Sequence, residues 1–147
     1  MTGPSLPALP CACASLRRAA RAVTQLYDAA LRDTGLRATQ FTLLQVLQRR
    51  GESMQGELGD FLALDSTTLS RTLQPLAARR WIKSRSGDDR RAALWSITAE
   101  GRRRLERATP AWEAAQQRLR DRIGGDPWLS LLEDLAGVAA LARSTSA

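Results

Sequence analysis

The sequence predicts a mainly α-helical single domain of six helices with one small β-hairpin. Over most of the chain, apolar residues recur every three or four positions, which is the spacing of a helix with one buried face. Between residues 81 and 97 this pattern gives way to two short apolar runs separated by turn-forming residues, which is typical of a hairpin. A length of 147 residues suits one domain.

The first third of the chain predicts an arm and two helices. Residues 1–10 contain three prolines and no charged side chain, and we expect them to form a flexible arm. A helix then begins at Ala12 and ends at Gly35, because glycine accepts the left-handed conformation that terminates helices. Thr39 is the expected N-cap of a second helix, which ends at Gly51.

Two shorter helices follow, separated by a tight break at residues 63–65. The first is expected from Met54 to Leu62 with Ser53 as its N-cap, and the second begins after Asp65 or Ser66. Two short helices joined in this way have the layout of a helix-turn-helix. The side chains expected to turn the second helix toward the core are Leu69, Leu73 and Leu76.

The hairpin comes next, with strands at residues 81–83 and 93–97 and a turn at 86–89. Thr98 then caps a long helix that runs to about Ile123 and that Pro110 should kink or divide. Two glycines, at positions 124 and 125, end this helix. Asp126 is the expected N-cap of a last helix that starts at Pro127.

Basic charge is concentrated in residues 79–104, which carry a net charge of +6 against +7 for the whole chain. Such a local excess is the electrostatic footprint of a polyanionic partner such as DNA. A solvated charged face produces the same pattern. The charge therefore indicates DNA binding only together with the helix-turn-helix and the hairpin beside it.

The outward face of the second short helix has the side chains that DNA recognition uses. Hydroxyl groups fit close to phosphates and base edges, and an arginine can bind the O6 and N7 atoms of guanine. A polar solvent-exposed face is the alternative, and the helix-turn-helix frame favours DNA. The DNA-binding residues predicted on this helix are Ser66, Thr67, Thr68, Ser70, Arg71 and Gln74.

The hairpin supplies four more predicted DNA-binding residues, Arg85, Asp89, Arg90 and Arg91. Asp89 and Arg91 are two positions apart and therefore share a side of a strand. A carboxylate in that place can hold the guanidinium outward, where it enters a DNA minor groove. A surface ion pair of small energetic consequence is the alternative.

Other classes of function lack their chemistry in this sequence. There is no histidine, no glycine-rich phosphate loop and no recognisable pair of carboxylates, so we predict neither an enzyme nor a metal or cofactor site. No apolar run approaches the roughly 18 residues that span a bilayer, and the first residues do not have the pattern of a secretory signal. We therefore expect a soluble, cytoplasmic protein.

The chain resembles the MarR family of bacterial winged helix-turn-helix regulators over about residues 12–142. The resemblance is carried by GLRATQFTLLQVLQRRG, MQGELGDFLALDSTTLSRTLQPLAARRWI and DDRRAALWSITAEG. The last segment has the family's Asp-x-Arg element at Asp89 and Arg91, followed by Ile-Thr-x-x-Gly. Two residues depart from the pattern. Arg80 stands where the family usually has glycine, and Pro75 removes a backbone hydrogen bond inside the recognition helix.

The resemblance implies a six-helix fold with a two-stranded wing and a homodimer that binds a palindromic operator through two recognition helices. A winged-helix lobe would span about residues 36–98, and dimerisation helices would span about 11–34 and 99–143. Family members are commonly repressors released by small, often aromatic or anionic, ligands. We therefore predict a sequence-specific transcription regulator. A nonspecific architectural DNA-binding protein and a protein–protein adaptor are the competing interpretations.

Two sets of residues are candidates for sensing a signal. Arg17, Tyr27, Phe41 and Trp112 are predicted to line an effector pocket between the lobes, although an aromatic side chain at a helical position is equally compatible with a core. Cys11 and Cys13 are the predicted redox residues. Cys13 precedes Tyr27 by a spacing similar to that in hydroperoxide-sensing members of the family, and packing at the dimer interface is the alternative.

Overall fold

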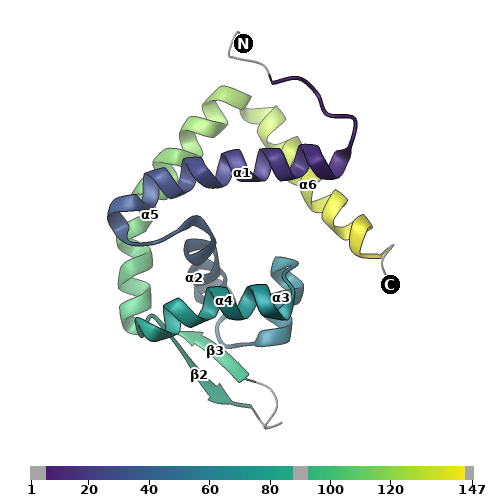
Figure 1. The fold of residues 1–147 in the computed structure, drawn as a ribbon. Helices are drawn as coiled ribbons and strands as arrows, with labels where there is room; N and C mark the ends of the chain where they lie inside the picture. Colours follow the sequence, from purple (N-terminus) through teal and green to yellow (C-terminus); the bar gives the residue numbers. More distant parts are fainter. Residues whose placement is uncertain (1–5, 88–92, 145–147) are drawn as a thin grey trace.

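The computed structural model describes residues 6–87 and 93–144, and within them it confirms the mainly helical class (Figure 1). Six α-helices, one short 3-10 helix and one three-stranded sheet make up these ranges. In chain order the elements are α1 (Ala12–Leu31), η1 (Arg32–Thr34), α2 (Ala38–Arg50), β1 (Ser53–Met54), α3 (Gln55–Leu62), α4 (Ser66–Ala78), β2 (Ile82–Ser86), β3 (Ala93–Ile97), α5 (Ala99–Ile123) and α6 (Gly125–Ser144).

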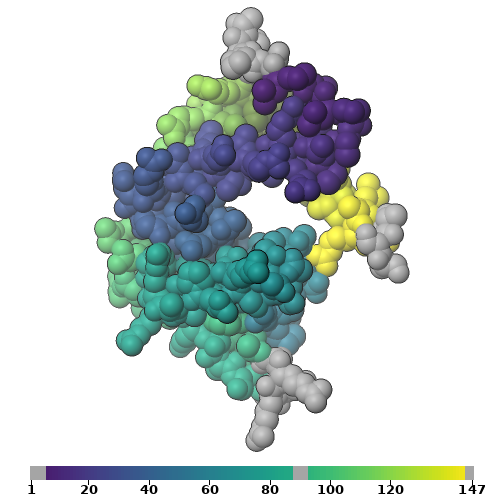
Figure 2. Space-filling model, in the orientation of Figure 1, coloured from purple at the N-terminus to yellow at the C-terminus, as the bar shows by residue number. Residues whose placement is uncertain are grey.

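The elements form two lobes that α5 connects. In Figure 1, α2, α3, α4 and the sheet lie below, α1 and α6 lie above, and α5 runs between the two groups. The end of α6 returns to the lower lobe, where Arg143 Nη2 donates to Asp60 Oδ1 of α3 at 2.9 Å. Figure 2 shows the molecule hollowed between α1 and the α3–α4 pair.

The core lies where α2, α4, the sheet and the lower part of α5 meet. Phe41 and Leu44 from α2 are fully buried, and the three leucines predicted on α4 are at most 1% exposed. One face of α4 is therefore committed to packing, and the opposite face is presented outward. The remaining large side chains that are completely or almost completely buried are Leu31, Leu43, Leu47 and Leu58.

Two helix starts differ from the sequence-based expectation because residues distant in the chain take part in them. α2 begins at Ala38, and its first amide donates to Asp28 Oδ1 of α1 at 2.7 Å, so Thr39 is not the N-cap. Ser53 is not the cap of α3 either, because it is buried in β1. The end of α2 at Gly51 is as predicted, whereas α1 ends at Leu31 and Gly35 terminates the 3-10 helix η1 that follows it; both glycines have positive φ angles.

The sheet is antiparallel with the strand order β1–β3–β2. Ile82 pairs with Ile97, and Ser86 pairs with Ala93, which confirms the predicted hairpin. The first strand is longer than the predicted 81–83, because pairing with β3 continues to Ser86, which was expected in the turn. The two-residue strand β1 pairs through Ser53 with Trp95 and was not predicted. We call β2, β3 and their connection the wing.

The last two helices make up most of the C-terminal third. Thr98 caps α5 by accepting from the Gly101 amide at 3.0 Å, as predicted. Pro110 does not divide α5, which continues to Ile123. α6 begins at Gly125, so Asp126 and Pro127 lie in its first turn rather than marking its start. In the described ranges, none of the helices combines the length and apolar character needed to cross a membrane.

Candidate nucleic-acid interface

The outward face of α4 carries a stripe of polar side chains opposite its buried leucines. Ser70 and Arg71 follow Thr67 by three and four residues, and Gln74 follows them by four and three, so the four residues share one side of the helix. Thr67, Arg71 and Gln74 are exposed, and Ser70 is half-buried at the edge of the stripe. These side chains project from a helix that the core fixes in place.

Asp65 organises the start of α4. Its Oδ1 accepts from the Thr68 amide at 2.9 Å and its Oδ2 accepts from the Thr68 hydroxyl at 2.6 Å, which is the N-cap arrangement expected of aspartate. These hydrogen bonds lower the pKa of Asp65, the one from the Thr68 hydroxyl most strongly. Ser66, in the first turn, is exposed, whereas Thr68 lines a cleft between the lobes together with Thr72.

Ser70 is joined to the wing by Gln55, the first residue of α3. Gln55 Nε2 donates to Ser70 Oγ at 3.0 Å, and Gln55 Oε1 accepts from Trp95 Nε1 of β3 at 3.2 Å. Neither Gln55 nor Trp95 was among the residues singled out from the sequence. The contact depends on the pairing of β1 with β3, and no local pattern signals that pairing.

The end of α4 explains how an arginine replaces the glycine usual in this place. Arg80 has a left-handed conformation with φ of 58°, its amide donates to the Ala77 carbonyl at 2.9 Å, and the Trp81 amide donates to the Leu76 carbonyl at 2.9 Å. This pair of hydrogen bonds is a Schellman motif, and Trp81 packs with Leu76 in the core. Pro75 does not interrupt the helix.

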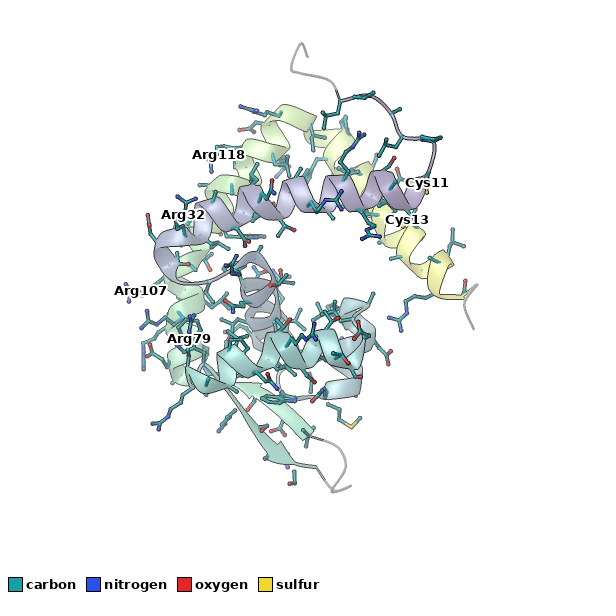
Figure 3. The ribbon with its side chains drawn as sticks, viewed as in Figure 1. Cys11, Cys13, Arg32, Arg79, Arg107 and Arg118 are labelled. Atoms are coloured by element: carbon teal, nitrogen blue, oxygen red, sulfur yellow. The ribbon has the colours of Figure 1, made fainter. Side chains whose placement is uncertain are left out.

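Two arginines flank the Trp81 ring at this end of α4. The guanidinium carbon of Arg79 lies 4.9 Å from the ring centroid, and that of Arg104 lies 5.4 Å from it. Arg79 also donates to the Gly35 carbonyl at 2.9 Å, which connects the end of the recognition helix to the turn before α2. In Figure 3 the labelled Arg79 lies at that end of α4.

In the wing, Arg85 forms an ion pair with Glu52. Its Nε lies 2.9 Å from Glu52 Oε2, and its Nη2 also contacts the carboxylate. The hydrogen bond from Arg85 is the main cause of the lowered pKa of Glu52. The other three residues predicted to bind DNA in the wing, Asp89, Arg90 and Arg91, lie outside the described residues.

Some of the basic charge between residues 79 and 104 is balanced locally. Arg103 Nη2 lies 2.7 Å from Glu100 Oε2, and Arg104 Nε lies 3.0 Å from Glu100 Oε1. These hydrogen bonds, first that of Arg103, lower the pKa of Glu100. The basic segment is therefore partly an ordered surface network, as well as a source of positive potential.

A cleft of about 330 Å³ separates α1 from the lower lobe. Tyr27 is one of its lining residues, and its hydroxyl donates to Gln116 Oε1 of α5 while burial raises its pKa. Phe41 is fully buried behind it and stacks on half-buried Trp112 with 5.3 Å between centroids. Arg17 is exposed elsewhere on α1. The cleft walls are formed by Val23, Thr24, Tyr27, Ala38, Thr39, Thr42, Leu43, Leu62, Leu64, Thr68 and Thr72.

The two cysteines lie at the start of α1, at the other end of this helix from η1 (Figure 3). Cys11 precedes the first turn and Cys13 lies within it, and both are exposed free thiols. Nearby, Arg18 Nη2 donates to the Pro7 carbonyl at 2.9 Å, so the arm folds back toward the helix.

Known proteins share this architecture. The MarR family model matches residues 34–92. The transcriptional regulator MosR of M. tuberculosis, crystallised in complex with DNA, is 34% identical, with 92% of this chain and 98% of that chain covered and a TM-score of 0.84. PcaV from Streptomyces coelicolor, solved with its natural ligand, is 20% identical, covers 93% and 99% of the two chains, and has a TM-score of 0.80.

A further relative is the HTH-type transcriptional regulator YwoH of Bacillus subtilis, itself uncharacterized, which is 28% identical over 91 residues. That match spans 62% of this chain and 66% of YwoH, just under two thirds of its length. The match to MosR extends over almost its whole length. It agrees with the interpretation of α4 as a recognition helix beside a wing. The chain belongs to the MarR family and is a DNA-binding transcription regulator of the winged helix-turn-helix type, not an enzyme.

Proposed function

We propose that the protein is a homodimeric repressor that binds a palindromic operator and is released by a small organic ligand. The observation that carries the DNA part is the polar stripe of α4, which stands opposite three buried leucines and is therefore held rigidly. The α4 helices of two copies would enter successive major grooves, about one helical turn apart. Such a regulator acts on cytoplasmic DNA.

The apolar surface of α6 supports the homodimer. Trp128 is the one residue of α6 that is buried, while the helix exposes large apolar side chains along most of its length. Contiguous apolar surface of this kind marks an interface. The large exposed residues are Leu129, Leu131, Leu132, Leu135, Val138 and Leu141.

The first experiment measures fluorescence anisotropy of the protein on DNA from upstream of its own gene, with a scrambled duplex as competitor. A regulator should prefer its operator by about 10³-fold or more. Arg71→Ala should weaken this binding strongly because it removes the arginine of the stripe. Arg118→Ala, an exposed arginine that Figure 3 shows on the upper part of α5, is the matched control.

Other results would select the competing interpretations. Equal affinity for both duplexes that falls steeply with salt would indicate a nonspecific architectural protein. Absence of binding to both duplexes, and to a random-sequence pool, would favour a protein–protein adaptor. In either case the operator model would be wrong.

The cleft between α1 and α4 supports release by a ligand. Its volume of about 330 Å³ suits a small molecule, and its walls combine apolar side chains with the hydroxyls of Tyr27 and several threonines. No charged residue is among the described residues that line it. A neutral or phenolic aromatic compound therefore fits it better than a strongly anionic one. Ligand would act by favouring a lobe spacing that binds DNA weakly.

A cleft-filling variant tests this assignment. Thr42→Phe should abolish release of DNA by a panel of neutral phenol-type compounds while leaving DNA affinity in their absence within about twofold, because Thr42 is on a cleft wall and outside the α4 stripe. Thr109→Phe, on α5, is the control. A variant with unchanged ligand response would place the effector elsewhere.

Thiol oxidation is a second candidate signal, favoured by the exposure of Cys11 and Cys13 two residues apart. Hydrogen peroxide would take two electrons from two thiols, giving one disulfide and two waters. Peroxide should then release DNA from the wild-type protein and not from Cys13→Ser. If Cys13→Ser responds as the wild type does, Cys13 is not the sensor. Mass spectrometry without reductant distinguishes a disulfide within one chain from one between two copies.

A further inference from the structure

Gln55 forms the only side-chain bridge that the described residues provide between the wing and the polar stripe of α4. It donates to Ser70 Oγ at 3.0 Å and accepts from Trp95 Nε1 at 3.2 Å. All three residues are half-buried, so these hydrogen bonds are partly protected from water. The bridge lies at the edge of the surface where DNA is expected.

The directions of the two hydrogen bonds in this bridge follow from the indole N–H of Trp95. An indole N–H can only donate, so it must meet the carbonyl oxygen of the Gln55 amide. The amide nitrogen then points to Ser70, and because that nitrogen can only donate, Ser70 Oγ must accept. A donor on β3 thus determines which role the serine hydroxyl takes.

The hydroxyl proton of Ser70 remains available. The hydroxyls of Thr72 and Thr109 each donate a hydrogen bond to the backbone carbonyl four residues earlier, at 3.1 and 2.8 Å. Within the described residues, no such acceptor is found for Ser70. With one lone pair engaged by Gln55, the hydroxyl keeps its proton for a further acceptor. Ser70 shares its side of α4 with Thr67, Arg71 and Gln74.

We propose that Gln55 is a positioning residue for sequence specificity, which makes Ser70 a hydrogen-bond donor that recognises an acceptor on a base edge. This inference rests on the proposed sequence-specific binding through α4. In the major groove, guanine offers two acceptors, thymine offers O4 and adenine offers N7, whereas cytosine offers only its amino donor. The base that faces Ser70 is therefore guanine, thymine or adenine, and cytosine is rejected.

The isosteric variant Gln55→Glu reverses the direction of the bridge. A carboxylate can accept from Trp95 Nε1 and can only accept from Ser70, so the serine would donate inward and present its lone pairs to DNA. Base preference at the contacted position should then move toward cytosine or adenine, which offer amino donors. The added negative charge should lower the affinity for all DNA sequences. The base preference compares affinities of the same variant for different sequences, so this uniform fall does not affect it.

The experiment selects bound duplexes from a random-sequence pool with the full chain and sequences them. Wild type should reject cytosine at one position of its motif by about tenfold. Gln55→Met and Ser70→Ala should each lose that rejection at the same position, and the double variant should lose no more than either alone. Ser70→Thr retains the hydroxyl and should retain the preference. Gln48→Glu, an exposed glutamine of α2, is the control for charge.

Each outcome decides the matter. A motif that is identical in wild type, Gln55→Met and Gln55→Glu would overturn the role of Gln55 while leaving the proposed regulator intact. A uniform loss of affinity in Ser70→Ala would overturn base recognition by placing Ser70 on a phosphate. If wild type selects no motif, the inference and the sequence-specific function fail together. Loss of the bridge is checked through the Trp95 indole N–H resonance, which should shift in Gln55→Met and stay unchanged in Gln48→Glu. Folding is checked by circular dichroism.

Discussion

At the scale of single residues, Asp65 makes the start of the recognition helix sensitive to acid. Its pKa is lowered by hydrogen bonds from Thr68. A lowered folded-state pKa stabilises the protein fully above the ordinary aspartate value of about 3.9, and this contribution is lost as pH falls through the lower folded-state value. Acidification should therefore release the cap and loosen the first turn of α4, where the DNA-binding stripe begins.

Asp65→Asn separates this titration from capping. Asparagine caps helices as well as aspartate does but does not titrate. The variant should therefore lose less thermal stability than wild type between about pH 5 and pH 3, as followed by circular dichroism. Some acid sensitivity should remain, because the pKa values of Glu52 and Glu100 are also lowered. Parallel melting curves for the two proteins would contradict this account.

Arg80 is strained by its left-handed backbone, which costs a side-chain-bearing residue roughly 1–2 kcal/mol. Arg80→Gly should remove that cost and raise the free energy of unfolding by about 0.5–1 kcal/mol, since glycine also loses more freedom on folding. Arg80→Ala removes the charge and retains the strain, so it should leave stability nearly unchanged. Urea unfolding compares them, and a gain for both variants would assign the effect to charge.

At the scale of elements, α5 can begin where it does only because residue 101 is glycine. A Cβ built there would lie 2.0 Å from the Trp81 carbonyl oxygen and 2.9 Å from Ile97 Cγ1. The start of α5 thus packs directly on the backbone that links α4 to the wing. This close approach is a physical reason for the glycine of the Ile-Thr-x-x-Gly element.

Gly101→Ala should therefore lower the free energy of unfolding by about 3 kcal/mol, because backbone must move to make room. The matched control is Gly56→Ala in α3, where a Cβ would meet nothing within 4 Å and where alanine should stabilise by about 0.5–1 kcal/mol. Chemical denaturation measures both. Equal effects at the two positions would show that helix propensity, and not the contact with Trp81, governs residue 101.

The helices and hairpin could be predicted because their signals are local. Leu69, Leu73 and Leu76 repeat at helical spacing, and Thr98 followed by Gly101 forms a self-contained cap. The start of α2 could not be predicted from sequence, because the side chain that caps it, Asp28, comes from another helix. The polar stripe of α4 could be predicted because its signal is local. The role of Gln55 could not, because Gln55 is brought to Ser70 by the pairing of β1 with β3.

At the scale of the whole molecule, one contact between the two lobes is polar and exposed. Arg143 of α6 donates to Asp60 of α3, with side chains that are 49% and 79% exposed. Such a surface pair contributes little to stability. The hollow between α1 and the α3–α4 pair in Figure 2 is closed on that side by a weak contact, which is compatible with the change in lobe spacing proposed above.

The apolar face of α6 leads to a prediction about assembly. Leu132→Glu combined with Leu135→Glu places two charges on exposed apolar positions of one helix, which should prevent a second copy from packing there. Sedimentation velocity should then show half the mass of the wild type. DNA affinity should fall by at least about 100-fold, because each copy would bind one half-site without the avidity of the pair.

Ser130→Glu is the control for this assembly prediction, because residue 130 is exposed on the side of α6 opposite Leu132 and Leu135 and should leave the dimer intact. Circular dichroism of the double variant should retain the wild-type helix signal, since Leu132 and Leu135 are 44% and 41% exposed in one copy. A dimer that persists in the double variant would place the interface elsewhere. The groove between α1 and α5, lined by Leu26, Ala30 and Leu119, would then be the next surface to test.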